Sequence, residues 1–159
     1  MDPGVRDAYF RAVGEYFQVA PEEVSIIGEW EVTPDEVPVV LFLAHRAGVS
    51  PDVLIGLRRG GRPWQEVGRR FGIQTTAFHL SLPEGAEKGR LTRAYEAFQA
   101  LPAWEWQQIR LEDEEVIALV NLRVLADQTG VPPLDILEGF RKAGSFVACY
   151  PLLLEKSEG

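Results

Sequence analysis

The sequence has few of the side chains that build disulfides and metal sites. Its single cysteine, Cys149, excludes a disulfide within the chain and a zinc site built from cysteines, because both need several thiols. The two histidines, His45 and His79, have no histidine partner four residues away, as a helical zinc motif would require. We therefore expect no metal site and no cofactor, and we expect Cys149 to be a small buried hydrophobic residue.

The motifs with which enzymes bind phosphate or activate a nucleophile are also missing. Gly60-Gly61 is followed by Arg62-Pro63 rather than by lysine and a hydroxyl residue, so it does not form a phosphate-binding loop. The acidic run Glu112–Glu115 is typical of a solvated helix start, where carboxylates complement the helix dipole. A nucleophile-elbow context is absent around Ser50, Ser81 and Ser145. These absences predict a protein that is not an enzyme.

Long hydrophobic runs are absent too. The longest strongly apolar stretch, Val37–Ala44, is interrupted by Pro38 and is much shorter than the roughly 20 residues that cross a bilayer. The start of the chain, MDPGVRDAYF, lacks the basic and apolar regions of a signal peptide. We expect no membrane span and a cytoplasmic protein, although a mature secreted or periplasmic form without its signal peptide would have the same sequence.

A short phrase occurs three times in the chain: valine, one residue, proline, two residues, then an aliphatic residue. Apolar residues at helical spacing precede it, and Gly48 and Gly130 stand where a helix needs a residue that tolerates left-handed backbone angles. A proline in the first turn then starts the next helix. Each phrase therefore predicts the elbow of a helical hairpin, with valine and the aliphatic residue packed inward. The three copies are Val19-Pro21-Val24, Val49-Pro51-Leu54 and Val131-Pro133-Ile136.

The second and third copies align over a longer stretch at an offset of 82 residues, which pairs Trp64 with Phe146. This alignment predicts an all-α fold of duplicated helical hairpins in one compact domain, residues 1–159. Thr33 and Glu36 have the spacing of a capping box, which marks the start of the second unit. We predict unit one at about 5–32, unit two at about 34–72, an insert at about 73–112 and unit three at about 113–154. Within the insert we expect a helix at about 90–101 and some strand-like character at 75–82.

The stretch WQEVGRRFGIQTTAFHL, residues 64–80, resembles a helix-turn-helix. Gly68 occupies the small-residue position and Gly72 the turn, while Val67, Phe71, Ile73 and Phe78 match the buried positions. The resemblance implies that residues 74–80 form a recognition helix of about two turns, cut short by Pro83. It implies nucleic-acid contacts from Gln74, Thr75, Thr76 and His79. The wider pattern also resembles uncharacterised bacterial helical-repeat proteins.

Charge is unevenly distributed along the chain. The net charge is −8, with −7 in residues 1–43, +4 in residues 44–73 and −5 in residues 74–159. An acidic chain is poorly suited to phosphate binding, which depends on lysine and arginine. The basic segment overlaps the helix-turn-helix-like stretch, but its arginines could equally pair with acidic residues such as Glu112–Glu115 or with an acidic partner. These arginines are Arg58, Arg59, Arg62, Arg69 and Arg70.

Together these patterns predict a non-enzymatic, macromolecule-binding or structural helical protein. Contact with a protein partner, or with further copies of the chain, is favoured over DNA. The alternative is a helix-turn-helix DNA-binding transcriptional regulator. Trp104 and Trp106 are two residues apart and cannot share one helical face, so exposure of one of them at an interface is an alternative to core packing, which is favoured.

The missing metal ligands give a direct test. Because we find no ligand set, removal of divalent ions with a chelator should leave the thermal unfolding midpoint unchanged. Thermal denaturation with and without the chelator measures this, and a fall of more than a few degrees would contradict the prediction.

Overall fold

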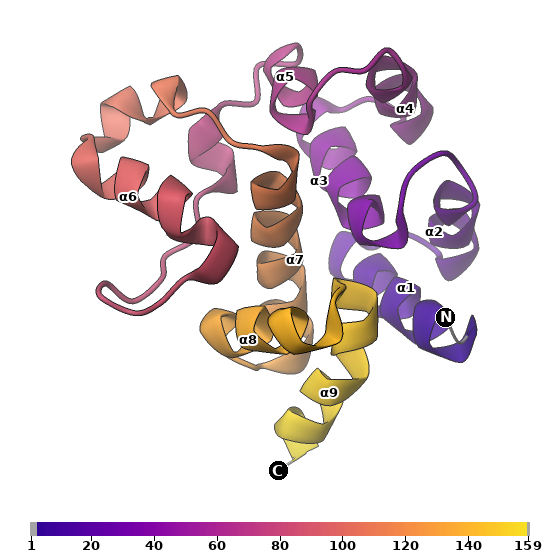
Figure 1. Ribbon diagram of the computed structural model, residues 1–159. Coiled ribbons are helices and arrows are strands. Elements are labelled where there is room, and N and C mark those ends of the chain that lie inside the picture. Colours follow the sequence, from indigo (N-terminus) through magenta and orange to yellow (C-terminus); the bar gives the residue numbers. More distant parts are fainter. Residues whose placement is uncertain (1–2, 159) are drawn as a thin grey trace.

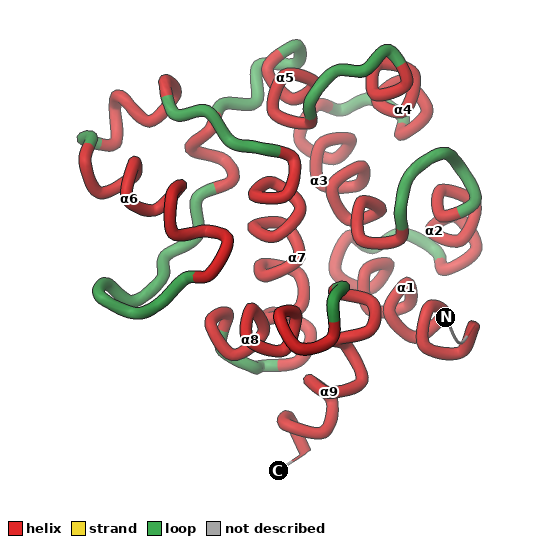
Figure 2. The backbone as a smooth tube through the Cα atoms, in the orientation of Figure 1, coloured by secondary structure: helices red, strands yellow, loops and turns green. Residues whose placement is uncertain are grey.

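The computed structural model describes residues 3–158 and confirms an all-α protein, with no strand in that range. Figure 1 shows the arrangement of the helices, and Figure 2 shows how short most of the connecting loops are. The α-helices are α1 Pro3–Phe17, α2 Pro21–Gly28, α3 Val37–Ala47, α4 Pro51–Arg59, α5 Trp64–Arg69, α6 Thr92–Ala100, α7 Asp113–Thr129, α8 Pro133–Ala143 and α9 Phe146–Glu158. The 3-10 helices are η1 Pro34–Glu36, η2 Thr75–Phe78, η3 Gly89–Leu91 and η4 Ala103–Gln108.

Helix α7 forms the centre of the molecule. It contacts α1, α3, α8 and α9, and it lies between α3 on one side and the segment that contains α6 on the other (Figure 1). Its aliphatic side chains are almost all buried, including Leu119, Leu122 and Leu125 at 0% exposure. A helix that is apolar on most of its surface needs neighbours on most sides, which is the position α7 has.

The predicted elbows join α3 to α4 and α7 to α8. Gly48 and Gly130 end the first helix of each pair in the left-handed region, at φ 69° and 74°, as the sequence predicted. Pro51 and Pro133 begin the second helix. Val131 is buried, as expected.

One detail of the elbow prediction was wrong. Val19 and Val49 are only half-buried, since they pack at the edge of the core. Sequence spacing alone could not show how deeply each valine is covered, because that depends on helices elsewhere in the chain.

Two pairs of helix starts in predicted units two and three are separated by the predicted offset. The starts of α4 and α8, and those of α5 and α9, are related by 82 residues. Trp64 and Phe146 begin the third helix of each unit and are both buried. In unit two the guanidinium of Arg58 lies over the Trp64 ring, whereas in unit three the ring of Phe140 stacks on Phe146.

Each unit also caps a helix of the other. The carboxylate of Asp35, in η1, accepts hydrogen bonds from the backbone N–H groups of Phe146 and Val147 at the start of α9, at 2.9 and 3.0 Å. The carboxylate of Asp113, at the start of α7, accepts one from the N–H of Trp64 at the start of α5, at 2.8 Å. Such caps satisfy donors that a helix start leaves open, so the two units hold each other in place.

The insert folds differently from part of the prediction. Its helix is confirmed as α6, but residues 75–82 contain the 3-10 helix η2 and no strand. Gln65, which is buried, holds both ends of the insert: its amide donates to Thr75 Oγ1 and Ile109 O at 2.8 Å and accepts from Leu111 N–H at 2.9 Å. These side-chain bonds satisfy the backbone groups that a strand partner would otherwise pair.

No single helix within residues 3–158 is long and apolar enough to cross a membrane. One pair of segments, Pro34–Ala47 with Pro51–Arg59, reaches the required length and composition together but is bent by 118°.

The two elbow valines should differ in how they tolerate charge. Val131→Asp would bury an unpaired carboxylate and should lower the free energy of unfolding by about 3 kcal/mol or more. Val49→Asp leaves the carboxylate partly in water and should cost about 1 kcal/mol. Urea denaturation of both variants measures the difference, and equal losses would contradict the observed burial.

Candidate functional site

Among the arginines of the basic segment, Arg58 has the most polar partners within the described residues. Its guanidinium donates to Glu36 at 3.2 Å and to the carbonyl of Arg62 at 3.0 Å, and it forms an ion pair with Asp113 at 2.8 Å. The indole N–H of Trp64 donates to the same Glu36 carboxylate at 2.7 Å. Arg58 therefore has a structural role, and its pairing with Asp113 agrees with the expected contact to the acidic run 112–115.

The remaining arginines of the segment are spread over the surface. Arg59 pairs with Glu31 at 3.3 Å, and Arg62 approaches Glu66 at 3.8 Å. Arg69 donates to the carbonyl of Gln107 at 2.8 Å. Arg70 is exposed and has no hydrogen bond or ion pair to the residues that the structure describes. The structure thus does not bring the predicted arginines together into one site.

The helix-turn-helix-like stretch differs from the predicted geometry. Instead of a two-turn helix over residues 74–80, it contains a single 3-10 turn, η2. Thr75, predicted to point outward, is fully buried and donates to Ile109 O at 3.2 Å. Gln74 and Thr76 are exposed. The reason is the insert, whose returning segment covers the face of η2 that a DNA groove would need.

His79, the last predicted contact residue, belongs to an aromatic cluster. Its ring lies 4.4 Å from that of Trp106 and 4.8 Å from that of Phe98, measured between centroids. Burial lowers the pKa of His79, and the nearby Arg123 guanidinium lowers it further. Within the expected pair of tryptophans, Trp104 is 78% exposed and Trp106 is half-buried.

The structure also shows the surroundings of Cys149 and of the side chains that could bind a metal ion. Cys149 is fully buried, as predicted, and burial raises the pKa of its thiol to about 11. Among residues 3–158 there is no group of three or more histidine, cysteine, aspartate or glutamate side chains placed to hold a metal ion.

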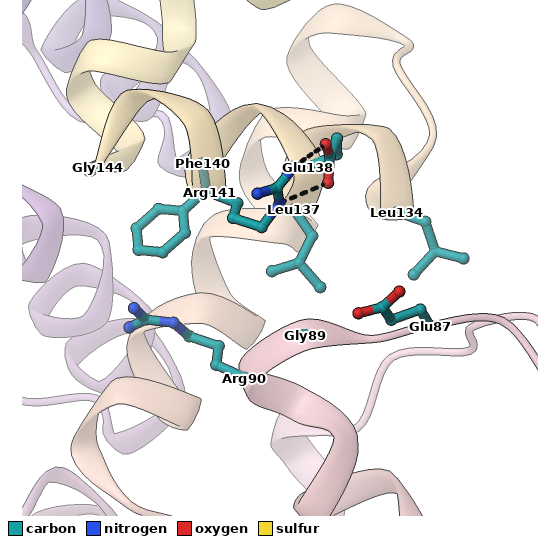
Figure 3. Close-up of a pocket in the computed structure, with 9 residues that line it drawn as sticks. All are labelled: Glu87, Gly89, Arg90, Leu134, Leu137, Glu138, Phe140, Arg141 and Gly144. Atoms are coloured by element: carbon teal, nitrogen blue, oxygen red, sulfur yellow. Dashed lines mark hydrogen bonds and ion pairs between the residues drawn. The ribbon is translucent and has the colours of Figure 1, made fainter.

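A groove of about 630 Å³ lies between helix α8 and the segment around η3, and it was not anticipated from the sequence (Figure 3). Its floor is apolar and comes from Leu134, Leu137 and Phe140, which are spaced three residues apart along α8. The opposite wall is formed by Glu87, Gly89 and Arg90 of the insert. The groove therefore joins two parts of the chain that are far apart in sequence.

The groove carries both signs of charge. Arg141 is paired with Glu138 at 2.6 and 3.0 Å, so these two charges are already compensated. The guanidinium of Arg90 lies 4.4 Å from the centroid of the Phe140 ring and has no ion pair in the described chain. Glu87 is exposed and also lacks an ion pair there. In Figure 3 Glu87 lies near Leu134, at one end of the groove, and Arg90 faces Phe140 at the other.

The structural role of the Arg58 cluster can be tested at Glu36. Glu36→Ala leaves the Trp64 indole N–H and one side of Arg58 without an acceptor, and it should lower the free energy of unfolding by about 3 kcal/mol. Arg59→Ala, which removes only an exposed ion pair, should change it by about 0.5 kcal/mol or less. Chemical denaturation compares the two, and similar losses would mean that the cluster does not support the fold.

Comparisons of the chain with models of protein families, with curated proteins and with solved structures find no match.

Proposed function

We propose that this protein is a non-enzymatic binding module whose groove beside α8 holds a short segment of a partner protein. The observation that carries the proposal is an apolar floor placed between two exposed charges of opposite sign, Glu87 and Arg90, neither of which forms an ion pair within the described residues. Such a combination suits a polypeptide, which can supply apolar and charged side chains at fixed spacing.

The floor provides the apolar contact. Leu134 is partly exposed, whereas Leu137 and Phe140 are buried deeper and form the base of the groove. An aliphatic side chain entering from solvent would cover Leu134 and contact the base. Burial of apolar area contributes roughly 25 cal/mol per Å², so one well-placed aliphatic residue can serve as an anchor.

The charges provide the orientation. A basic residue of the partner would pair with Glu87, and an acidic residue would pair with Arg90 at the other end. Because Arg90 is held over the Phe140 ring, its position is defined before binding and less side-chain freedom is lost. We therefore propose a partner segment with a basic residue, then one or more aliphatic residues, then an acidic residue, or the same series in reverse chain direction.

The alternative, a helix-turn-helix DNA-binding regulator, has weaker support. The stretch that would enter a major groove is one 3-10 turn with Thr75 buried, and Arg58 and Arg69 are engaged within the molecule. Base recognition needs an exposed element with several side chains that reach the base edges.

A selection of short random peptides on the native protein and on a charge-reversed variant tests the proposal. The native protein should select peptides with a basic and an acidic residue flanking aliphatic ones. The variant Glu87→Arg with Arg90→Glu should keep the fold, because both side chains are exposed. It should select peptides in which the basic and the acidic residue have exchanged places along the peptide.

Trp104→Ala serves as the matched control, since Trp104 is exposed and does not line the groove. Peptides selected on this variant should keep the native pattern. If the charge-reversed protein selects the same peptides as the native one, or if selection depends on Trp104, the groove is not the binding site.

A further inference from the structure

Two further arginines, Arg46 and Arg123, are not among the contact residues predicted from the sequence. Arg46 is in the last turn of α3 and Arg123 is in α7. Both guanidinium groups are placed against one aromatic ring, that of Phe42, with distances to its centroid of 4.7 Å for Arg46 and 5.6 Å for Arg123. Two like charges are therefore held close together.

The surroundings of this pair do not supply a counter-charge. Arg46 forms no hydrogen bond or ion pair within the described residues, and Arg123 donates only to the backbone carbonyls of Ala77 and His79, at 3.1 and 2.7 Å. Burial lowers the pKa of Arg123, and the charge of Arg46 lowers it as well. A half-buried guanidinium beside another one is unfavourable unless an anion compensates it.

The two arginines line two adjoining hollows, of about 590 and 450 Å³. The first also contains Gln74 and Thr76, whose side chains can donate hydrogen bonds, and the second contains Tyr16 and Phe17. Neither hollow is lined by aspartate or glutamate, although the chain has 24 acidic residues. Both hollows are open toward solvent, so a small molecule can reach the two arginines directly.

We propose that Arg46 and Arg123 form a binding site for the oxyanion of a small molecule, a phosphate or a carboxylate group, at the junction of the two hollows. The planar guanidinium fork matches the geometry of both oxyanions. Gln74 and Thr76 donate further hydrogen bonds to the anion, and the organic part of the ligand lies against Tyr16 and Phe17.

The positions of the two arginines favour this role over structural pairing. The carbonyls of Ala77 and His79 orient the Arg123 guanidinium while leaving part of its N–H groups available. Arg46 is exposed, and its stacking on Phe42 brings it to the same place from another helix. The site uses none of the residues of the groove beside α8, so it can be tested separately from the proposed partner binding.

The test uses inorganic phosphate and acetate as probes, each compared with chloride at equal ionic strength. Thermal unfolding and calorimetric titration are measured for the native protein, for Arg46→Gln and for Arg70→Gln. Arg46→Gln should keep the fold, because the side chain is exposed and makes no hydrogen bond. Arg70→Gln is the matched control, since it removes an exposed arginine that has no hydrogen bond or ion pair in the described chain and does not line either hollow.

At least one of the two probes should raise the unfolding midpoint of the native protein and of Arg70→Gln by several degrees more than chloride does. Arg46→Gln should weaken binding of that probe about tenfold or more. A response to phosphate alone assigns the site to phosphorylated ligands, and a response to acetate alone assigns it to carboxylates.

Three outcomes would overturn the proposal. The first is that neither probe stabilises the native protein beyond chloride. The second is an equal response of all three proteins, which would reflect the general exclusion of such salts from protein surfaces. The third is tight, salt-sensitive binding of duplex DNA that Arg46→Gln abolishes, which would assign the two arginines to a nucleic-acid backbone.

Discussion

The hydrogen bonds around Asp35 connect helices that lie far apart in the sequence. Its carboxylate caps the start of α9, and its backbone carbonyl accepts from the side chain of Asn121 in α7, at 3.0 Å. The oxygen of Asn121 in turn accepts from the hydroxyl of Tyr9 in α1. Four parts of the chain, α1, η1, α7 and α9, therefore meet in one polar network inside an otherwise apolar core.

This network is costly to bury and must be complete. Burial raises the pKa of Asp35 even though the N–H groups of Phe146 and Val147 act in the opposite direction. Tyr9 and Asn121 are fully buried, so neither could turn to water if its partner were lost. Leaving a buried polar group without a hydrogen-bond partner destabilises the fold by more than a formed hydrogen bond stabilises it. Helix arrangements that break this network are therefore disfavoured, even where their apolar contacts are as extensive.

Unit three contributes an equivalent constraint through Asp113, which caps α5 and pairs with Arg58. Asp35 belongs to unit two and caps a helix of unit three, whereas Asp113 belongs to unit three and caps a helix of unit two. In each unit, backbone N–H groups at the start of the third helix are bonded by a carboxylate of the other unit. The exchange explains why the helices pack as one body, and why acidic residues at two helix starts have a role beyond the dipole of their own helix.

Local features of the fold were predictable because their causes are local. The capping box of Thr33 and Glu36 forms, with Thr33 N–H and hydroxyl both donating to the carboxylate. Gly48 and Gly130 end helices because only a residue without a side chain adopts left-handed angles at little cost. The correspondence of Trp64 with Phe146 followed from the offset of 82 residues, and both are buried.

The errors and omissions have distant causes. Thr75 was expected outside because its position in a helix-turn-helix pattern points outward, but Gln65 and the returning chain at Ile109 bury it. The groove depends on Arg90 lying over Phe140, a contact across 50 residues that no periodic pattern indicates. The pairing of Arg46 with Arg123 on Phe42 is hidden in the same way, because the two arginines come from different units.

The groove beside α8 and the first of the two hollows each have one wall in the insert and another in helices outside it. Ile73, Gln74, Thr76 and Ala77 of the insert line the first hollow beside Arg123, and Glu87, Gly89 and Arg90 line the groove beside α8. Binding residues are often placed on segments that a rigid scaffold positions. Here the positioning is polar: Gln65 holds the two ends of the insert, and Arg123 itself donates to the insert carbonyls of Ala77 and His79. An anion that accepts hydrogen bonds from the remaining N–H groups of Arg123 would therefore bind the same side chain that holds the insert in place. Arg123 would both bind the ligand and position the wall of the hollow around it.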